Sequence, residues 1–255
     1  MPNTPATGAT ALRVEGLATD YPAGEMIQPH QHDAHQIVHA IAGVARVFVA
    51  GAVWIVPPGR GLWVPARVTH AIRCVGALHM RTVYLEGAHP SFPQDVRVVA
   101  VSALLREIIT RLAQAEAAPA AAARQHPHLV SLLIEEIAQA DIAPLRLPSP
   151  RDPRIRRIAE ALLENPAEAG SLDDWADRLG MSRRSLIRHI RQETGMTYRE
   201  LRRQARVAAG LERLALGRTV TQAAFDVGFD SPSAFIQAFR VVTGSTPGRV
   251  FRPGR

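Results

Sequence analysis

Lysine is absent from this 255-residue sequence, and cysteine occurs once, at Cys74. A single cysteine excludes an intrachain disulfide and favours a reducing compartment. No apolar run reaches the length of a transmembrane helix, and the opening residues MPNTPATGATALRVEG lack the basic and apolar regions of a signal peptide. The absence of lysine carries no functional weight, because codon usage alone can produce it. We therefore expect a cytoplasmic protein without a membrane segment.

The first part of the chain has no net positive charge, and the second part has only one histidine. All 30 basic residues are arginine, against 23 acidic residues, which gives a formal net charge of +7. Residues 1–150 hold 11 of each sign, whereas residues 151–255 hold 19 arginines and 12 acidic residues. Nine of the ten histidines lie before residue 150. This asymmetry indicates a polyanionic partner for the C-terminal part.

The N-terminal part predicts strands followed by two helices. We expect a flexible arm and first strand over residues 1–25. Over residues 26–98, short apolar runs broken by Gly and Pro about every ten residues predict a small all-β barrel or sandwich. Residues 99–141 contain two amphipathic stretches, VSALLREIITRLAQ and LVSLLIEEIAQA. These helices either cover the sheet or form the seam of a homodimer, and the sequence leaves both open.

A proline-rich segment separates this part from a helical one. Residues 142–153 contain four prolines, a density that excludes a helix or a central strand. We expect a linker there, because the charge changes at the same point. Residues 154–255 predict helices throughout, with Ser171, Ser182 and Ser231 as N-caps. The fold class is therefore α+β with two domains, the second of them all-α.

Helix, tight turn and helix follow one another between residues 176 and 190. Ala176 allows close helix contact, Gly180 accepts a left-handed turn conformation, and Leu186 fits between the two helices. In GMSRRSLIRHIRQETG, Leu186 and Ile190 share a buried face, and three arginines line the opposite face. These features are typical of a helix-turn-helix whose second helix enters the major groove.

The same layout occurs a second time, where Ala224, Gly228 and Phe235 take the corresponding roles. A joining helix of about 20 residues would span roughly 30 Å. That length is close to the roughly 34 Å between successive major grooves on one side of B-DNA. The two units and their spacer therefore predict one chain that contacts two grooves.

The stretches WADRLGMSRRSLIRHIRQETGMTYRELRRQAR and VTQAAFDVGFDSPSAFIQAFRVVTGSTPGRVFR closely resemble the AraC/XylS family of bacterial transcription regulators. The resemblance extends from Ile155 to Arg252. Trp175 stands where the family usually has Leu, and Ala223 where it usually has Ile. Both are core positions, so the departures concern packing. The resemblance implies a DNA-binding domain over residues 154–255 whose partner is a double-stranded operator.

In this family the exposed face of each recognition helix contacts bases. The corresponding positions are Arg184, Ile187 and Arg188 in the first helix and Ser233, Ile236 and Gln237 in the second. The chemistry agrees, because arginine can bond guanine O6 and N7 and glutamine can pair with adenine. Arg183, Arg191 and Arg240 are expected to hold phosphates, which position the protein without specifying sequence. The alternative for each arginine is a solvated helix face.

Histidines in the N-terminal half follow a metal-ligand pattern. In HQHDAHQIVHAIAG, His30 and His32 lie two apart and point to the same side of a strand, and VPARVTH ends at His70. These segments resemble the two cupin motifs, in which three histidines and a glutamate bind one divalent metal. Gln36 stands in place of the usual glutamate and is a poorer ligand, and Arg67 stands in place of a usual glycine.

The candidate pocket is therefore His30, His32, Gln36 and His70, for one divalent metal or a small-molecule effector. A polar pocket lining without a metal is the alternative. His35 and His39 are close by in the sequence and could join either arrangement. The stretches VPPGRGLWVPARVTHAIRC and HMRTVYLE also resemble cupin-type regulators that often control small-molecule exporters.

Two functions of different classes fit these features. The first is a sequence-specific, homodimeric transcription regulator whose activity depends on a small ligand or metal in the barrel. The second is a metal-dependent cupin enzyme that carries a DNA-binding appendage. An enzyme needs a general acid or base beside its metal. The nearby carboxylates Glu25 and Asp33 look like turn residues, so we assign no catalytic residue and favour the regulator.

Overall fold

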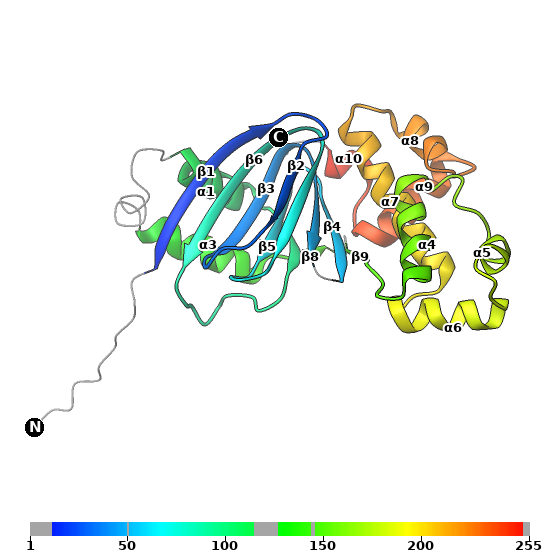
Figure 1. The fold of residues 1–255 in the computed structure, drawn as a ribbon. Helices are drawn as coiled ribbons and strands as arrows, with labels where there is room; N and C mark the ends of the chain where they lie inside the picture. Colours follow the sequence, from blue (N-terminus) through cyan, green and yellow to red (C-terminus); the bar gives the residue numbers. More distant parts are fainter. Residues whose placement is uncertain (1–11, 50, 115–126, 144–145, 252–255) are drawn as a thin grey trace, which may run out of the picture.

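The structure is a computed structural model, and it describes residues 12–49, 51–114, 127–143 and 146–251. It contains a β-rich part followed by a helical part, which lie side by side in Figure 1. This confirms the predicted α+β fold class. The predicted N-terminal arm lies mostly outside the described residues, and so does Arg252 at the end of the family resemblance. Among the described helices, none is both long and apolar enough to cross a membrane.

The β-rich part is one continuous sheet. Its strands are β1 (Arg13–Tyr21), β2 (Met26–His30), β3 (His35–Val49), β4 (Ala52–Val56), β5 (Arg60–Val64), β6 (His70–Glu86) and β7 (Arg97–Ala100). The long strands β3 and β6 pair antiparallel at its centre, and β1 and β2 both pair with β6. The register of β3 shifts on either side of Ala42. Gly43 has φ 76° there, and a Cβ atom would lie 2.4 Å from the carbonyl oxygen of Ala77.

Two helices cover the outer side of this sheet, away from the helical part (Figure 1). They are α1 (Ala103–Gln114) and α3 (Pro127–Gln139). Their apolar faces are buried in one core with strand residues such as Val14 and Leu85. The predicted helices are confirmed, and their apolar faces pack on the sheet. Dimerisation stays a prediction, and a dimer seam here would have to use their outer faces, which expose Leu104 and Leu132.

The proline-rich segment contains two short strands that the sequence did not predict. β8 (Ile142–Ala143) pairs with β7, and β9 (Arg146–Pro148) pairs with β4. Each has one strand neighbour, so both lie at an edge of the sheet. Proline is tolerated at an edge because no further strand needs its missing N–H. The expected linker therefore returns to the β-rich part before it enters the helices.

The helical part holds seven helices among the described residues. They are α4 (Pro153–Glu164), α5 (Leu172–Arg178), α6 (Arg183–Thr194), α7 (Tyr198–Ala215), α8 (Val220–Asp226), α9 (Pro232–Thr243) and α10 (Pro247–Val250). Ser171, Ser182 and Ser231 cap α5, α6 and α9 through their side-chain oxygens, as predicted. Gly195 and Gly244 end α6 and α9 in the left-handed conformation, with φ 71° and 72°. Local capping therefore determines where these helices begin and end.

Candidate functional site

Helices α5 and α6 form the first helix-turn-helix unit. Gly180 has φ 60° in the turn between them, which glycine adopts at little cost. Leu186 and Ile190 of α6 are buried, and Trp175 and Ala176 of α5 are buried beside them in the same core. The opposite face of α6 is consequently left to solvent.

The residues expected to contact bases from α6 lie on this open face. Arg184, Ile187 and Arg188 are all exposed. Arg183 differs from them, because its Nη1 lies 2.8 Å from both carboxylate oxygens of Asp173. A phosphate contact by Arg183 would therefore compete with an existing ion pair, whereas Arg191 is exposed and forms no ion pair among the described residues.

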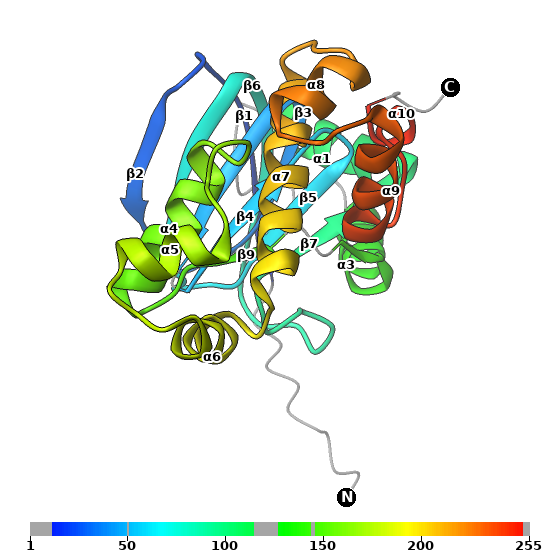
Figure 2. The same ribbon diagram turned by 90° about the vertical axis from the view of Figure 1, so that its right-hand side faces the viewer.

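Helices α8 and α9 form the second unit. Phe235 and Phe239 of α9 are fully buried, with ring centroids 5.6 Å apart. Ser233, Gln237 and Arg240 are exposed on the other side of α9, and Ile236 is half-buried. All the predicted base-contacting positions except Ile236 are thus fully open, and α6 and α9 both pack against α7 between them (Figure 2).

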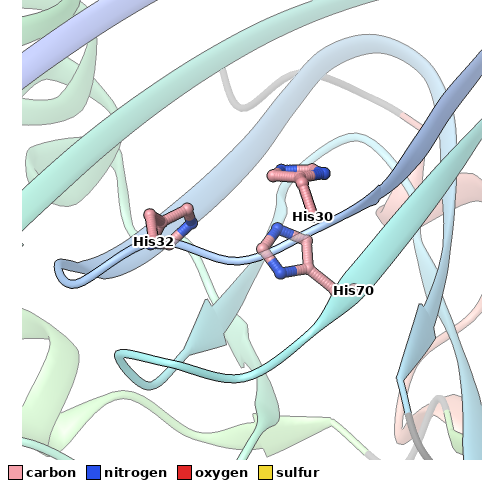
Figure 3. A group of neighbouring side chains, drawn as sticks. All are labelled: His30, His32 and His70. Carbon is pink, nitrogen blue, oxygen red and sulfur yellow. The ribbon is translucent and has the colours of Figure 1, made fainter.

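The three histidines of the predicted pocket lie together. His30 ends β2, His32 lies in the turn before β3, and His70 begins β6, as Figure 3 shows. One ring nitrogen from each lies within 4.8 Å of the others. The ring centroids of His30 and His70 are 4.3 Å apart, and those of His32 and His70 are 5.3 Å apart. This is the only such group of His, Cys, Asp or Glu in the described part of the chain. We call it the histidine triad.

The backbone orients all three rings in the same way. Nδ1 of His30 lies 2.8 Å from the carbonyl oxygen of Gln28, Nδ1 of His32 lies 2.6 Å from that of Ala34, and Nδ1 of His70 lies 2.9 Å from that of Val68. A carbonyl oxygen can only accept a hydrogen bond, so each Nδ1 must carry a proton. Each neutral ring consequently keeps its lone pair on Nε2 and can bind a metal through that atom.

Gln36 lies beside the triad on β3 and is 1% exposed. Its Oε1 is 3.1 Å from Nε2 of His32, and its Nε2 donates to the hydroxyl of Tyr84 at 3.2 Å. The Nε2 atom of His70 is buried and has no hydrogen-bond partner among the described residues. Burial lowers the pKa of His70 to about 4, so this ring stays neutral across the physiological pH range.

His35 and His39 do not join the triad. The ring of His35 stacks on Trp63, with centroids 5.3 Å apart and planes 15° apart. His39 is buried, and its Nδ1 lies 2.9 Å from the carbonyl oxygen of Arg60. Burial lowers the pKa of both histidines. Both side chains pack at other points along β3, so neither of these neighbouring histidines belongs to the triad.

Arg67 occupies a backbone position that suits glycine. It has φ 64° and is the one described non-glycine residue with positive φ. Its backbone N–H donates to the carbonyl oxygen of His32 at 2.8 Å, and its side chain contacts Asp33 at 3.0 Å. This turn therefore holds the His32 loop against the start of β6, and its conformation explains why the cupin motif usually has glycine here.

An ion pair that the sequence did not predict joins the two parts of the molecule. Nη2 of Arg46 on β3 lies 2.6 Å from Oε2 of Glu212 on α7, and Nε lies 2.9 Å from Oε1. The two side chains are only 12% and 7% exposed. Burial raises the pKa of Glu212, although Arg46 opposes this shift. Desolvation therefore outweighs the attraction, and the pair contributes orientation more than net stability.

Comparisons with known proteins agree with this two-part layout. Sequence models described as a helix-turn-helix domain and an AraC-like ligand binding domain match residues 175–253 and 12–133. The chain is 33% identical over 226 residues to the HTH-type transcriptional regulator NimR of Escherichia coli strain K12. The aligned residues cover 88% of this chain and 82% of NimR. It is 26% identical over 247 residues to the HTH-type transcriptional activator RhaS of Escherichia fergusonii, over 89% of this chain and 87% of RhaS.

Solved structures were compared as well. ToxT from Vibrio cholerae O395 aligns with 94% of this chain and 96% of its own at 11% identity, with a TM-score of 0.39.

Proposed function

The chain belongs to the AraC family of helix-turn-helix transcription regulators with an AraC-like ligand-binding domain, and from this premise we propose that a divalent transition metal on the histidine triad controls its binding to operator DNA. As a member of this family the chain is a regulator and not an enzyme, so the cupin-enzyme alternative is set aside. The observation that carries the proposal is that Nδ1 of each of the three rings lies 2.6–2.9 Å from a backbone carbonyl oxygen, which leaves the lone pair of each neutral ring on Nε2.

The donor set fits a metal such as Zn²⁺ or Fe²⁺. Three imidazole nitrogens with one position left for another ligand are a usual set for these ions. The backbone carbonyls that bond each Nδ1 act as the outer ligand shell. When bound, the metal would supply a link between β2, the turn before β3 and the start of β6.

Gln36 adds a second argument for a cation. His32 donates through Nδ1, so its Nε2 carries a lone pair, and the oxygen of Gln36 faces that lone pair at 3.1 Å. Two acceptors in this position can be satisfied by a metal that both ligate, by a proton on Nε2 of His32, or by rotation of the amide, which would let nitrogen donate instead. A metal shared by the triad and Gln36 satisfies the first arrangement.

The ion pair between Arg46 and Glu212 offers a route from the triad to the DNA-binding helices. His70 pairs with Val49 in the sheet, and Arg46 lies three residues before Val49 on the same strand. Glu212 is on α7, which packs against both recognition helices. A shift of the start of β6 on metal binding would therefore reach α7 through one buried, directional contact.

The test measures stability and DNA affinity in chelator-stripped protein. Calorimetry with Zn²⁺, Fe²⁺ and Mn²⁺ should show stabilisation of the wild type by about 2.7 kcal/mol when one metal is present at 100 times its Kd. His32→Ala and His70→Ala should lose this gain, whereas the exposed control His79→Ala should keep it. If the metal stabilises His32→Ala and His70→Ala as much as the wild type, the triad is not the metal site. If the metal stabilises neither the wild type nor any variant, an organic effector is left as the ligand.

Control of DNA binding needs a separate measurement. An operator can be selected in vitro from random duplexes, and its Kd measured with and without the metal. The wild type should change its Kd, and His32→Ala should not. Arg46→Met/Glu212→Met should still be stabilised by the metal but should no longer change its Kd for DNA. A full response of this double variant would exclude the ion pair as the route.

A further inference from the structure

A groove lined by arginines runs between α7 and α9. It encloses about 460 Å³, and four arginines of α7 line one side of it, with Gln237 of α9 on the other. The arginines are Arg199, Arg202, Arg203 and Arg206. Their spacing of three and four residues places them on one stripe of the helix. Sequence reasoning assigned phosphate contacts only on α6 and α9 and gave this stripe no role.

Three of the four arginines have no ion-pair partner in the part of the chain that the structure describes. Arg199, Arg202 and Arg203 form no ion pair with any carboxylate among the described residues, and the Nε atoms of Arg202 and Arg203 are buried without a hydrogen-bond partner. Arg206 is different, because its Nε donates to the carbonyl oxygen of Pro166 at 3.3 Å and its guanidinium lies 5.5 Å from the ring centroid of Phe229. Arg206 is thus part of the packing, and the other three are available to a ligand.

The charge on this stripe is not balanced locally. The nearest carboxylate on the same helix, Glu200, accepts a bond of 2.8 Å from the backbone N–H of Thr197 and so caps α7. Burial and, after it, the charge of Arg202 lower the pKa of Arg206, whereas Asp230 opposes the shift. Like charges this close repel one another unless an anion lies between them. An external polyanion would remove this repulsion.

The stripe lies between the two recognition helices. Arg191 lies in the last turn of α6, and α6 packs against α7. At its other side the stripe faces Gln237, one of the predicted base-contacting residues. Figure 2 shows α7 running through the middle of the helical part, with α6 at its lower end and α9 beside it. A basic path therefore connects α6 to α9 along α7.

We propose that Arg199, Arg202 and Arg203 bind the DNA phosphates that lie between the two major-groove segments contacted by α6 and α9. α7 has 18 residues, which corresponds to roughly 27 Å. Between two successive major grooves on one side of B-DNA lies a minor groove with its bordering phosphates. The inference rests on the proposed placement of α6 and α9 on DNA, and it is independent of the metal.

The experiment measures the dependence of Kd on salt for Arg199→Gln/Arg203→Gln. The probes are an operator selected in vitro and a random duplex of equal length. Each lost phosphate contact should lower the slope of log Kd against log salt by about 0.9, so the double variant should lose about 1.8 on both duplexes. Phosphate ethylation interference on the operator should weaken between the two major-groove segments in the same variant.

Two further variants keep the test decisive. Arg111→Gln/Arg157→Gln removes two exposed arginines elsewhere and should leave the slope nearly unchanged. Arg199→Lys/Arg203→Lys keeps both charges and should keep most of the slope. The proposal would be overturned if the salt slope fell by the same amount in Arg111→Gln/Arg157→Gln, or in Arg199→Lys/Arg203→Lys, as in Arg199→Gln/Arg203→Gln.

The test also separates DNA from a small anion. If inorganic phosphate stabilises the wild type but not Arg199→Gln/Arg203→Gln, and the salt slope is unchanged, the groove holds a small anion and the proposal is wrong. If Arg188→Ala has no effect on sequence preference while the slope still falls, the stripe binds phosphates and the assignment of α6 fails instead. The two failures are therefore distinguishable.

Discussion

The two parts of the chain bury different kinds of side chain. Among the described residues, the β-rich part buries the polar side chains of Gln36, His39, His70 and Thr82, whereas the helical part buries only those of Glu212 and Thr243. The excess positive charge shows the reverse pattern, because it lies in the helical part and on its outer faces. The helical part thus has its candidate DNA contacts on the surface, whereas the histidine triad of the β-rich part extends from the exposed His30 to the buried His70.

This difference matches what each part has to recognise. DNA is too large to enter a domain, and its phosphates are held by arginines that stay in water. A metal or small effector is bound by convergent groups in a concave interior. Among the described residues, Arg46 and Glu212 form the one buried ion pair that joins the two parts. Substitutions at this contact should therefore cause the largest change in unfolding free energy.

Breaking one partner of that contact should destabilise the whole chain. Arg46→Met leaves the carboxylate of Glu212 buried without a partner and should cost about 3–5 kcal/mol of unfolding free energy. Arg46→Met/Glu212→Met removes both charges and should recover most of this loss, because a buried pair contributes little net stability. Denaturant unfolding of both variants measures the difference. A double variant as unstable as the single one would mean that packing, and not charge, joins the two parts.

The surface chemistry predicts a smaller and more selective effect. Arg188→Ala should weaken binding to the selected operator by about 1–3 kcal/mol and binding to random DNA very little, because Arg188 is exposed on the base-contacting face of α6. Arg191→Ala should weaken both about equally and flatten the salt dependence. Competition binding with the two duplexes measures both variants, and equal losses for Arg188→Ala would make it a phosphate contact.

The sequence could predict the features that depend on residues close by in the chain. Helix caps and ends in the C-terminal part depend on neighbours in the chain, so Ser182, Gly195 and Ser231 could be placed correctly. The buried positions of Leu186 and Phe235 follow from helix periodicity alone. The resemblance to the cupin motifs places His30, His32 and His70 in one hypothesis, which their proximity in the structure supports.

Long-range contacts could not be predicted. Arg46 and Glu212 are 166 positions apart, and neither lies in a motif. His35 and His39 have the spacing of possible ligands, but their packing against Trp63 and Arg60 depends on how β3 pairs with β5. The strands β8 and β9 were missed because prolines argue against strands unless an open edge is present. In each case the missing information was the identity of a distant neighbour.

The buried histidine His39 also predicts that the stability of the β-rich part depends on pH. His39 is buried and its pKa is lowered, so the folded state binds fewer protons than the unfolded state below the ordinary histidine pKa of about 6.5. Stability should therefore fall as the pH drops from 6.5 towards the lowered value, by up to about 1.4 kcal/mol per pH unit. Calorimetry from pH 7 to pH 5 should show a smaller loss for His39→Gln. Identical pH profiles would mean that His39 does not stay neutral in the folded protein.

The smallest expected effect tests the identity of the interior ligand. Gln36→Glu places a carboxylate 3.1 Å from Nε2 of His32, at the position of the current amide oxygen. A carboxylate is a stronger metal ligand than an amide, so the Kd for Zn²⁺ should fall about tenfold, which is about 1.4 kcal/mol. Titration calorimetry of the wild type and Gln36→Glu measures this change.

The metal-free form of the same variant separates the two interior functions. The hydroxyl of Tyr84 lies 3.2 Å from the Gln36 side chain and can donate to one oxygen of the new carboxylate. The other carboxylate oxygen would remain buried beside the triad. Without metal, Gln36→Glu should therefore be less stable than the wild type, and with metal it should be at least as stable. If the loss is the same with and without metal, the triad lines a pocket for an organic effector, and the contrast between a metal-binding interior and a DNA-binding surface no longer holds.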